Sequence, residues 1–118
     1  MTDNSITIIK TMFNLFNTTK AYPDLAGHEF KNKWKAAGQP ALIDVRTRNE
    51  FKAGTLPGAT NIDFFSPTFR EQFGKLDKSK EYFLFCRSGN RSGQACNLLA
   101  REGYKVHNLA GGIGAWPL

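Results

Sequence analysis

Hydrophobic and polar residues follow two repeating patterns along most of the chain. Short apolar runs that come after turns predict buried strands at residues 41–45, 59–62, 82–85 and 106–109. Apolar residues three or four positions apart, with capping signals, predict helices at residues 27–37, 48–53, 67–74 and 91–102. Ser66 is predicted to cap the third of these helices with Pro67 in its first turn, and Gly111-Gly112 begins a last short turn or helix.

This order of elements predicts the fold class. Strands and helices that alternate with short connections favour an α/β fold with a central, mostly parallel sheet and helices on both faces. In such sheets the binding crevice lies beyond the carboxyl ends of the strands. Asp44 lies near the end of one predicted strand and Cys86 directly follows another. We therefore expect the chemistry of this protein at that edge of the sheet.

The first 22 residues stand apart as an N-terminal extension, and the predicted domain spans residues 23–118. Apolar residues of the extension lie close to helical spacing, at Ile6, Ile9, Met12, Phe13 and Phe16. The spacing favours a helix packed on the domain, although residues 6–9 are also compatible with a short strand. Tyr22-Pro23-Asp24 interrupts the pattern.

Net charge, apolar content and cysteine count limit which partners and which cellular compartment we expect for this protein. The net charge of +6 is compatible with nucleic acid, a membrane surface or small anions, but the lysines are scattered as on solvated faces and turns. We therefore expect no nucleic-acid partner. No apolar span of about 20 residues is present, and residues 1–4 lack the features of a signal peptide. Two cysteines without an export signal favour free thiols, so we expect a cytoplasmic protein. We also expect it to be a monomer and to bind no membrane.

The candidate nucleophile is Cys86, because the loop that it begins is suited to an anion. The loop leads into a predicted helix, whose free N–H groups and positive end face the sulfur. Its central residues allow the backbone to curl around an anion, and its two guanidinium groups add positive charge. A buried structural cysteine is the alternative, but two arginines and a turn are not expected after one. The loop reads Cys86-Arg87-Ser88-Gly89-Asn90-Arg91.

The spacing within the loop separates two kinds of cargo. Loops that hold a transferred phosphoryl group have the pattern Cys-x5-Arg, in which the arginine fork closes around the phosphate oxygens. Here the second arginine is Arg91, which gives Cys-x4-Arg, and Ser92 occupies the x5 position. The shorter loop favours a smaller cargo, such as one transferred sulfur atom.

Four motifs, in the same order as in the family, make the chain resemble single-domain rhodaneses, which are sulfurtransferases. They are residues 42–46 with Glu50-Phe51, 54–59 with Asn61-Ile62, 86–92 and 109–116. The resemblance covers about residues 25–117 and implies the rhodanese α/β fold, with a Cys86 persulfide held by the backbone amides of residues 87–91. Thr55 stands where the family usually has histidine, and Leu56 replaces a β-branched residue. We expect this departure to affect local packing rather than catalysis.

The predicted function is transfer of sulfane sulfur from thiosulfate, or a related anionic donor, to a thiophilic acceptor such as cyanide or a protein thiol. The predicted catalytic residue is Cys86, and no cofactor is expected. The predicted substrate-binding residues are Arg87, Ser88, Gly89, Asn90 and Arg91; the predicted supporting residues are Asp44, Arg46 and Ser92. Two alternatives remain, namely a phosphatase or arsenate reductase on the same fold and a non-catalytic rhodanese-like module that binds a partner or senses redox state.

Other candidate residues have a structural and a functional interpretation. Asp44 and Arg46 could help to bind substrate, or could fix neighbouring loops through hydrogen bonds, with Glu50 as a further partner. Cys96 could resolve the persulfide as a disulfide, or could be a small buried residue on a helix face. The two histidines have no ligand spacing beside either cysteine, so we expect no metal site.

Overall fold

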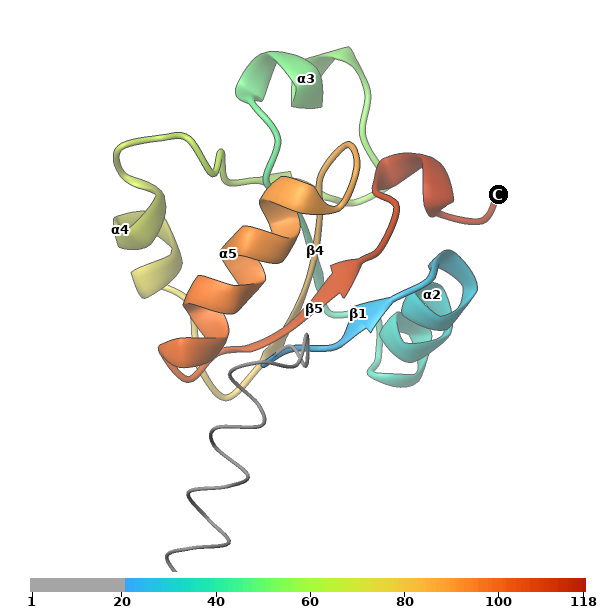
Figure 1. The fold of residues 1–118 in the computed structure, drawn as a ribbon, viewed down its shortest axis with the longest axis horizontal. Coiled ribbons are helices and arrows are strands. Elements are labelled where there is room, and N and C mark those ends of the chain that lie inside the picture. The colour runs from blue at the N-terminus through green and yellow to red at the C-terminus, as the bar shows by residue number, and fades with distance from the viewer. Residues whose placement is uncertain (1–20) are drawn as a thin grey trace, which may run out of the picture.

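The computed structural model describes residues 21–118, so the predicted N-terminal helix at residues 6–16 lies outside the described part of the chain. The strands are β1 (Asp24–Leu25), β2 (Ala41–Asp44), β3 (Thr60–Asn61), β4 (Glu81–Phe85) and β5 (Lys105–Leu109). The helices are α2 (Gly27–Ala36), α3 (Arg48–Ala53), α4 (Phe69–Gly74), α5 (Asn90–Arg101) and the 3-10 helix η1 (Ile113–Ala115). Figure 1 shows how these elements are arranged.

All five strands pair in parallel, in the order β1-β5-β4-β2-β3. The predicted α/β fold with a parallel central sheet is therefore confirmed. Asp44, the last residue of β2, lies opposite Phe85, the last residue of β4. Because parallel strands end at the same edge of a sheet, Asp44 and Cys86 are brought to one end of the domain. In Figure 1 the loop after β4 and helix α3 lie at that end.

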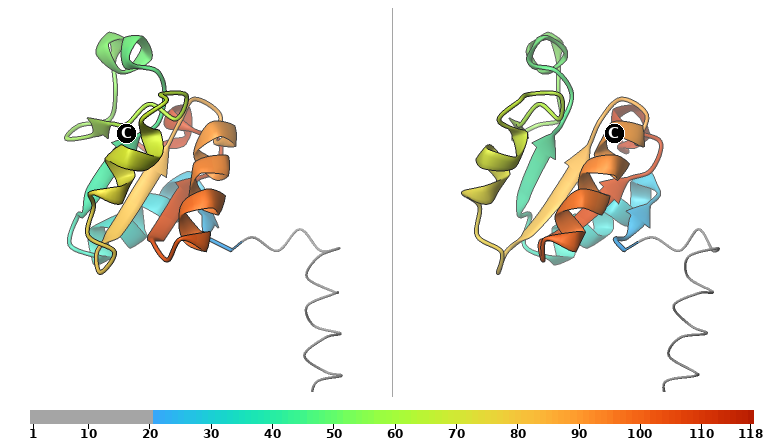
Figure 2. Two further views of the ribbon diagram at one scale, coloured as in Figure 1. Left: turned by 90° about the vertical axis from the view of Figure 1, so that its left-hand side faces the viewer. Right: turned by 60° about the vertical axis from the view of Figure 1, so that its left-hand side comes forward.

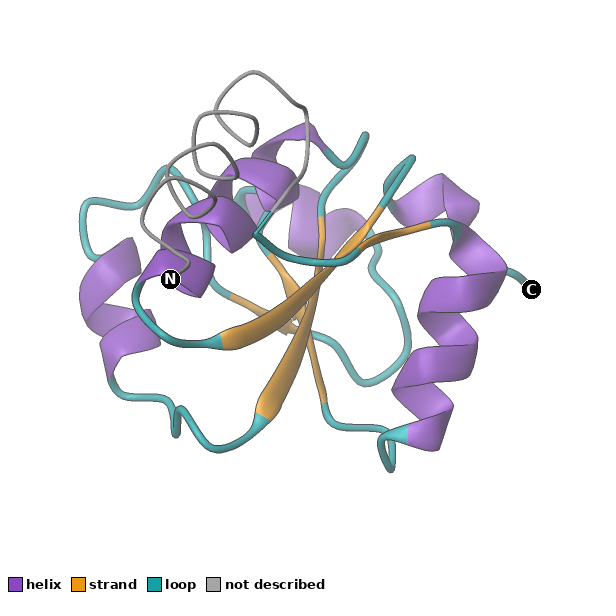
Figure 3. Ribbon diagram, turned by 60° about the horizontal axis from the view of Figure 1, so that its bottom comes forward, coloured by secondary structure: helices purple, strands orange, loops and turns teal. Residues whose placement is uncertain are grey.

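Each face of the sheet carries its own apolar core, because side chains of β4 alternate between the two faces. Tyr82 and Leu84 belong to the core under α4 and α5, whereas Phe83 and Phe85 belong to the core under α2. Phe30 of α2 is fully buried and meets Phe83 edge to face, with ring centroids 5.3 Å apart. Figures 2 and 3 show the strands between helices on both sides, as the alternating sequence pattern predicts.

The structure corrects the sequence prediction at two places. Helix α4 begins at Phe69 and not at Pro67, because Ser66 accepts the Thr68 N–H in a turn and its carbonyl accepts the Phe69 N–H. Strand β1 lies at Asp24–Leu25, where the sequence indicated only a break. A strand of two residues is too short to show an alternation of apolar and polar positions in the sequence. Only its pairing with β5 in the structure defines it.

Among the helices of residues 21–118, none is both long enough and apolar enough to cross a membrane.

Candidate active site

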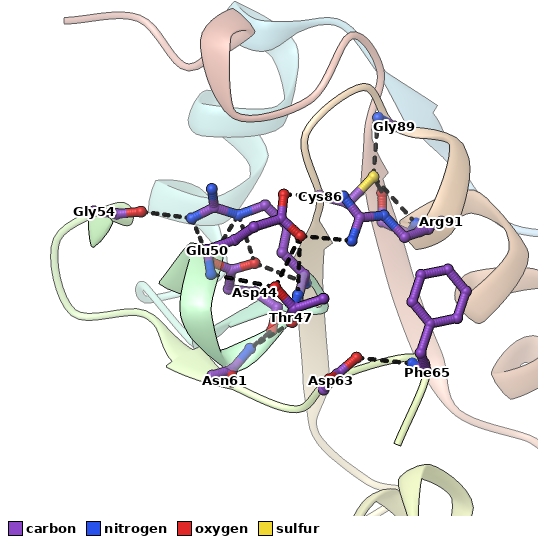
Figure 4. A network of polar contacts seen from close by, with 12 residues as sticks. Asp44, Thr47, Glu50, Gly54, Asn61, Asp63, Phe65, Cys86, Gly89 and Arg91 are labelled. Carbon is purple, nitrogen blue, oxygen red and sulfur yellow. Dashed lines mark hydrogen bonds and ion pairs between the residues drawn. The ribbon is translucent and has the colours of Figure 1, made fainter. Parts of the chain in front are cut away.

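Cys86 follows β4 directly and is fully buried at the N-terminal end of α5. The chain curls around the sulfur because Gly89 adopts the left-handed conformation, with φ of 93°. Cys86 Sγ accepts a hydrogen bond from the Gly89 N–H at 3.1 Å (Figure 4). It also accepts from the Ser92 N–H at 3.4 Å and from the Ser92 hydroxyl at 3.2 Å. These donors surround the sulfur as a ring that suits an anion.

The same donors determine the acidity of the thiol. Burial is the largest influence and by itself raises the pKa of Cys86. The Ser92 hydroxyl and the N–H groups of Ser92, Ser88 and Gly89 together outweigh burial, so that the pKa lies below its ordinary value. The N-terminus of the twelve-residue helix α5 favours negative charge at the same position. The geometry therefore stabilises a Cys86 thiolate.

We predict that Ser92→Ala raises the pKa of Cys86, because it removes the hydroxyl donor and leaves the backbone donors in place. With less thiolate at pH 7, alkylation by iodoacetamide should slow by about three- to tenfold. Ser88→Ala is the matched control, since the Ser88 hydroxyl accepts from the Asn90 N–H and is not one of the hydrogen-bond donors to Sγ. An unchanged alkylation pH profile in Ser92→Ala would show that the hydroxyl does not stabilise the anion.

The two loop arginines have different surroundings. Arg87 is exposed and forms no ion pair within residues 21–118. Arg91 forms a bidentate pair with Glu50 of α3, at 2.8 Å for Nη1–Oε1 and 3.2 Å for Nη2–Oε2. Its guanidinium carbon also lies 5.7 Å from the centre of the Phe65 ring. The sequence placed both arginines at the substrate, and the structure shows that Glu50 occupies the fork of one of them.

Glu50 is held by helix α3 as well as by Arg91. Its carboxylate accepts from the N–H and the hydroxyl of Thr47, and the Thr47 hydroxyl accepts the Glu50 N–H, which makes a capping box. The hydrogen bond from Arg91 is the main cause that lowers the pKa of Glu50 to about 2. Glu50 is therefore ionised at neutral pH and compensates the charge of Arg91.

Asp44 and Arg46 form a buried pair beside the loop that holds α3. The Asp44 carboxylate accepts from Arg46 Nη2 at 2.7 Å, from the Arg46 N–H at 2.9 Å and from the Thr55 hydroxyl at 2.9 Å. Arg46 Nη2 also donates to the Gly54 carbonyl at 2.6 Å. The pair thus joins the end of β2 to the turn after α3. Thr55 therefore contributes a hydrogen bond that the sequence had not indicated.

Two residues of the β5–η1 segment support the Cys86 loop and were not identified from the sequence. The Ile113 N–H donates to the Cys86 carbonyl at 2.8 Å, and the Asn108 side-chain amide donates to the Gly89 carbonyl at 3.1 Å. Gly112 lies against the backbone of Arg87. For this segment the sequence had indicated only a short turn or helix that begins at Gly111-Gly112.

Neither Cys96 nor His107 is among the hydrogen-bond partners of Cys86 Sγ. Cys96 is fully buried on α5, and burial is the main cause that raises its pKa, so this thiol stays protonated. His107 Nε2 forms a hydrogen bond of 2.7 Å with the carboxylate of Glu81, which lies on β4. Within residues 21–118, no three His, Cys, Asp or Glu side chains gather in a way that could hold a metal ion.

Comparison with known families agrees with this geometry. The family description "Rhodanese-like domain" matches residues 27–117. The chain belongs to the rhodanese family. The chain is 41% identical over 86 residues to YtwF of Bacillus subtilis, which is provisionally named a sulfurtransferase, and the match covers 73% of the chain and 82% of YtwF. A sulfurtransferase of Allochromatium vinosum is 40% identical over 76 residues, which are 64% of this chain and 69% of that protein.

Solved structures lead to the same fold. A rhodanese-like domain protein from Staphylococcus aureus superposes with a TM-score of 0.70 and 28% identity, over 80% of this chain and 91% of that one. The relatives that are named sulfurtransferases support a rhodanese-type sulfurtransferase as the family-level function of the chain.

Proposed function

We propose that this rhodanese moves sulfane sulfur from thiosulfate, or a related small anionic donor, to a thiophilic acceptor through a persulfide on Cys86. The observation that carries the proposal is the ring of donors around a buried sulfur at a strand end: the Gly89 N–H and the N–H and hydroxyl of Ser92, at 3.1 to 3.4 Å. These donors lower the pKa of Cys86 despite its burial.

In the first step the Cys86 thiolate attacks the outer sulfur of thiosulfate. A bond forms between the two sulfur atoms while the sulfur–sulfur bond of thiosulfate breaks, and sulfite leaves with the electron pair. The loop N–H groups that donate to Sγ can also donate to the outer sulfur of the persulfide, which then carries the negative charge. They can do so because the backbone already curls around this position. The exposed Arg87 guanidinium adds attraction for an anionic donor.

In the second step a nucleophilic acceptor attacks the outer sulfur of the persulfide. The bond between that sulfur and Sγ breaks, and its electron pair returns to Cys86 as thiolate. Cyanide would leave as thiocyanate, and a protein thiolate would leave as a persulfide. The ring of donors that stabilises the free thiolate also favours Sγ as the leaving group in this step.

The test is to incubate the protein with thiosulfate and to measure the intact mass and the released sulfite. We expect a gain of about 32 Da, one sulfur atom, that cyanide removes. Cys86→Ser should gain nothing, whereas Cys96→Ser should behave as wild type because the raised pKa of the Cys96 thiol keeps it protonated. Absence of the adduct with both thiosulfate and 3-mercaptopyruvate, or an adduct on Cys86→Ser, would refute the proposal.

A second candidate function is phosphoryl or arsenate chemistry, since one structural neighbour from Rhodopseudomonas palustris is described as of unknown function and a candidate tyrosine phosphatase. That neighbour superposes with a TM-score of 0.60 and 25% identity, over 81% of this chain and 80% of its own. Against this function, the loop is one residue short for Cys-x5-Arg and Glu50 occupies the fork of Arg91. Hydrolysis of p-nitrophenyl phosphate, or arsenate reduction, faster than sulfur transfer would favour it.

A further inference from the structure

We propose that Glu50 is a specificity-determining residue: it neutralises Arg91, leaves Arg87 as the uncompensated guanidinium of the Cys86 loop, and so limits the affinity for doubly charged donors. This inference rests on the proposed sulfur transfer and deepens it. Relative to a loop with two free guanidinium groups, the site would favour donors with one negative charge or none over dianions such as thiosulfate.

The geometry of the pair removes the Arg91 fork from the donor. Nη1 and Nη2 of Arg91 each donate to a different oxygen of Glu50, which is the arrangement in which guanidinium also holds sulfate-like oxyanions. Phe65 is 65% exposed, and the centre of its ring lies 5.7 Å from the guanidinium carbon of Arg91. A donor that needs the fork of Arg91 must therefore displace Glu50 (Figure 4).

Glu50 is not free to move away from Arg91. Its Oε1 also accepts from the Thr47 N–H and the Thr47 hydroxyl, both at 3.1 Å, so the first turn of α3 fixes the carboxylate. The side chains of Arg91 and Glu50 are only 20% and 30% exposed. A pair that is held in this way keeps its charge compensated while a donor approaches, unlike an exposed pair between two mobile side chains.

Arg91 belongs to the loop that begins at the reacting sulfur and is the fifth residue after Cys86. The pKa of Arg91 is raised chiefly by its hydrogen bond to Glu50, and the Cys86 thiolate contributes to the same rise. Because Glu50 cancels this charge, the Cys86 site is less positive than the loop sequence alone suggests. Removal of the Glu50 charge should therefore expose a second cation to any anion at Cys86.

Glu50→Gln tests the inference, because glutamine removes the charge and keeps an amide oxygen that can accept from Thr47 in the capping box. We expect the KM for thiosulfate to fall by about three- to tenfold at low ionic strength, with a smaller change in kcat. The difference should shrink as salt is added. Glu102→Gln is the matched control: it removes the same charge from the exposed pair with Arg70 and should leave KM unchanged.

The double variant Glu50→Gln/Arg91→Gln tests whether Arg91 is the cation that Glu50→Gln makes available to the donor. If Arg91 is that group, the double variant should lose the gain in thiosulfate affinity. A gain that persists without Arg91, or equal KM values for wild type and Glu50→Gln, would overturn the inference. Thermal unfolding of each variant shows whether the fold is retained.

A readout without turnover separates this inference from the proposed function. Sulfate is a dianion that transfers no sulfur, and it should protect Cys86 from alkylation by neutral iodoacetamide at lower concentration in Glu50→Gln than in wild type. Equal protection in Glu50→Gln, wild type and Glu102→Gln would refute the masking of Arg91, whatever the enzyme activity. Tighter protection in a protein that never gains sulfur from thiosulfate or 3-mercaptopyruvate would instead refute the sulfur transfer and support the masking.

Discussion

Gly112→Ala is expected to lower kcat/KM for sulfur transfer by about a hundredfold or more, because it displaces the loop that holds the Cys86 sulfur. A Cβ at position 112 would lie 2.6 Å from the Ser88 nitrogen and closer still to the carbonyl group of Arg87. Gly112 also has φ of 79° and ψ of −167°, a conformation essentially restricted to glycine. The loop must move to accept the methyl group, and the hydrogen bonds of 3.1 to 3.4 Å to Sγ would lengthen.

The control for this prediction is Gly114→Ala, two residues further along the chain. A Cβ there meets nothing within 4 Å, and its φ is not positive, so this variant should stay within about 1 kcal/mol of wild-type stability. Both variants are compared by steady-state kinetics and by the pH profile of Cys86 alkylation. If Gly112→Ala matched Gly114→Ala in both measurements, the close approach of Gly112 to the loop would have no role in catalysis.

The largest loss of stability is expected from Asp44→Ala, at about 3–5 kcal/mol of unfolding free energy. Asp44 is fully buried, and its removal leaves the buried Arg46 guanidinium without its carboxylate. The Thr55 hydroxyl and the Arg46 N–H lose their acceptor as well. Since small domains are stable by about 5–15 kcal/mol, this single change should bring the protein close to unfolding.

Denaturation in urea, followed by the fluorescence of Trp34 and Trp116, measures this effect without reference to activity. Asp44→Asn should cost less, because the amide oxygen can still accept from the Thr55 hydroxyl. Glu102→Ala, which breaks the exposed pair with Arg70, should cost at most about 1 kcal/mol. A loss below about 1 kcal/mol in Asp44→Ala would mean that water replaces Asp44 at Arg46.

Local sequence predicted those parts of the site that depend on neighbouring residues. The apolar run of β4 followed by a polar loop gave the position of Cys86, since a buried strand and the helix after it can be read from their periods. The spacing from Cys86 to Arg91 and Ser92 predicted a loop too short for phosphate. The prediction failed at β1, whose two residues are too few to show a pattern, and at the start of α4, where the residues read as a helix cap form a turn before the helix.

Contacts between distant segments decided how the charged residues of the candidate site are paired. Arg91 was expected at the substrate, but its partner Glu50 is 41 positions away in sequence, and only the placement of α3 beyond the ends of the strands brings them together. The capping box of α3 holds that carboxylate in place. The hydrogen bond from Thr55 to Asp44 likewise depends on the fold, which brings together two residues that are 11 positions apart.

The sequence by itself determined the fold class and the family, and it predicted the nucleophile. Periodicity and motif order are properties of the linear chain, and they place Cys86 at a strand end whatever surrounds it. The tertiary structure decided how the charged residues near that sulfur are paired. A guanidinium group binds whichever acceptor the fold brings within reach, and here the fold brings Glu50 to Arg91 and leaves Arg87 exposed.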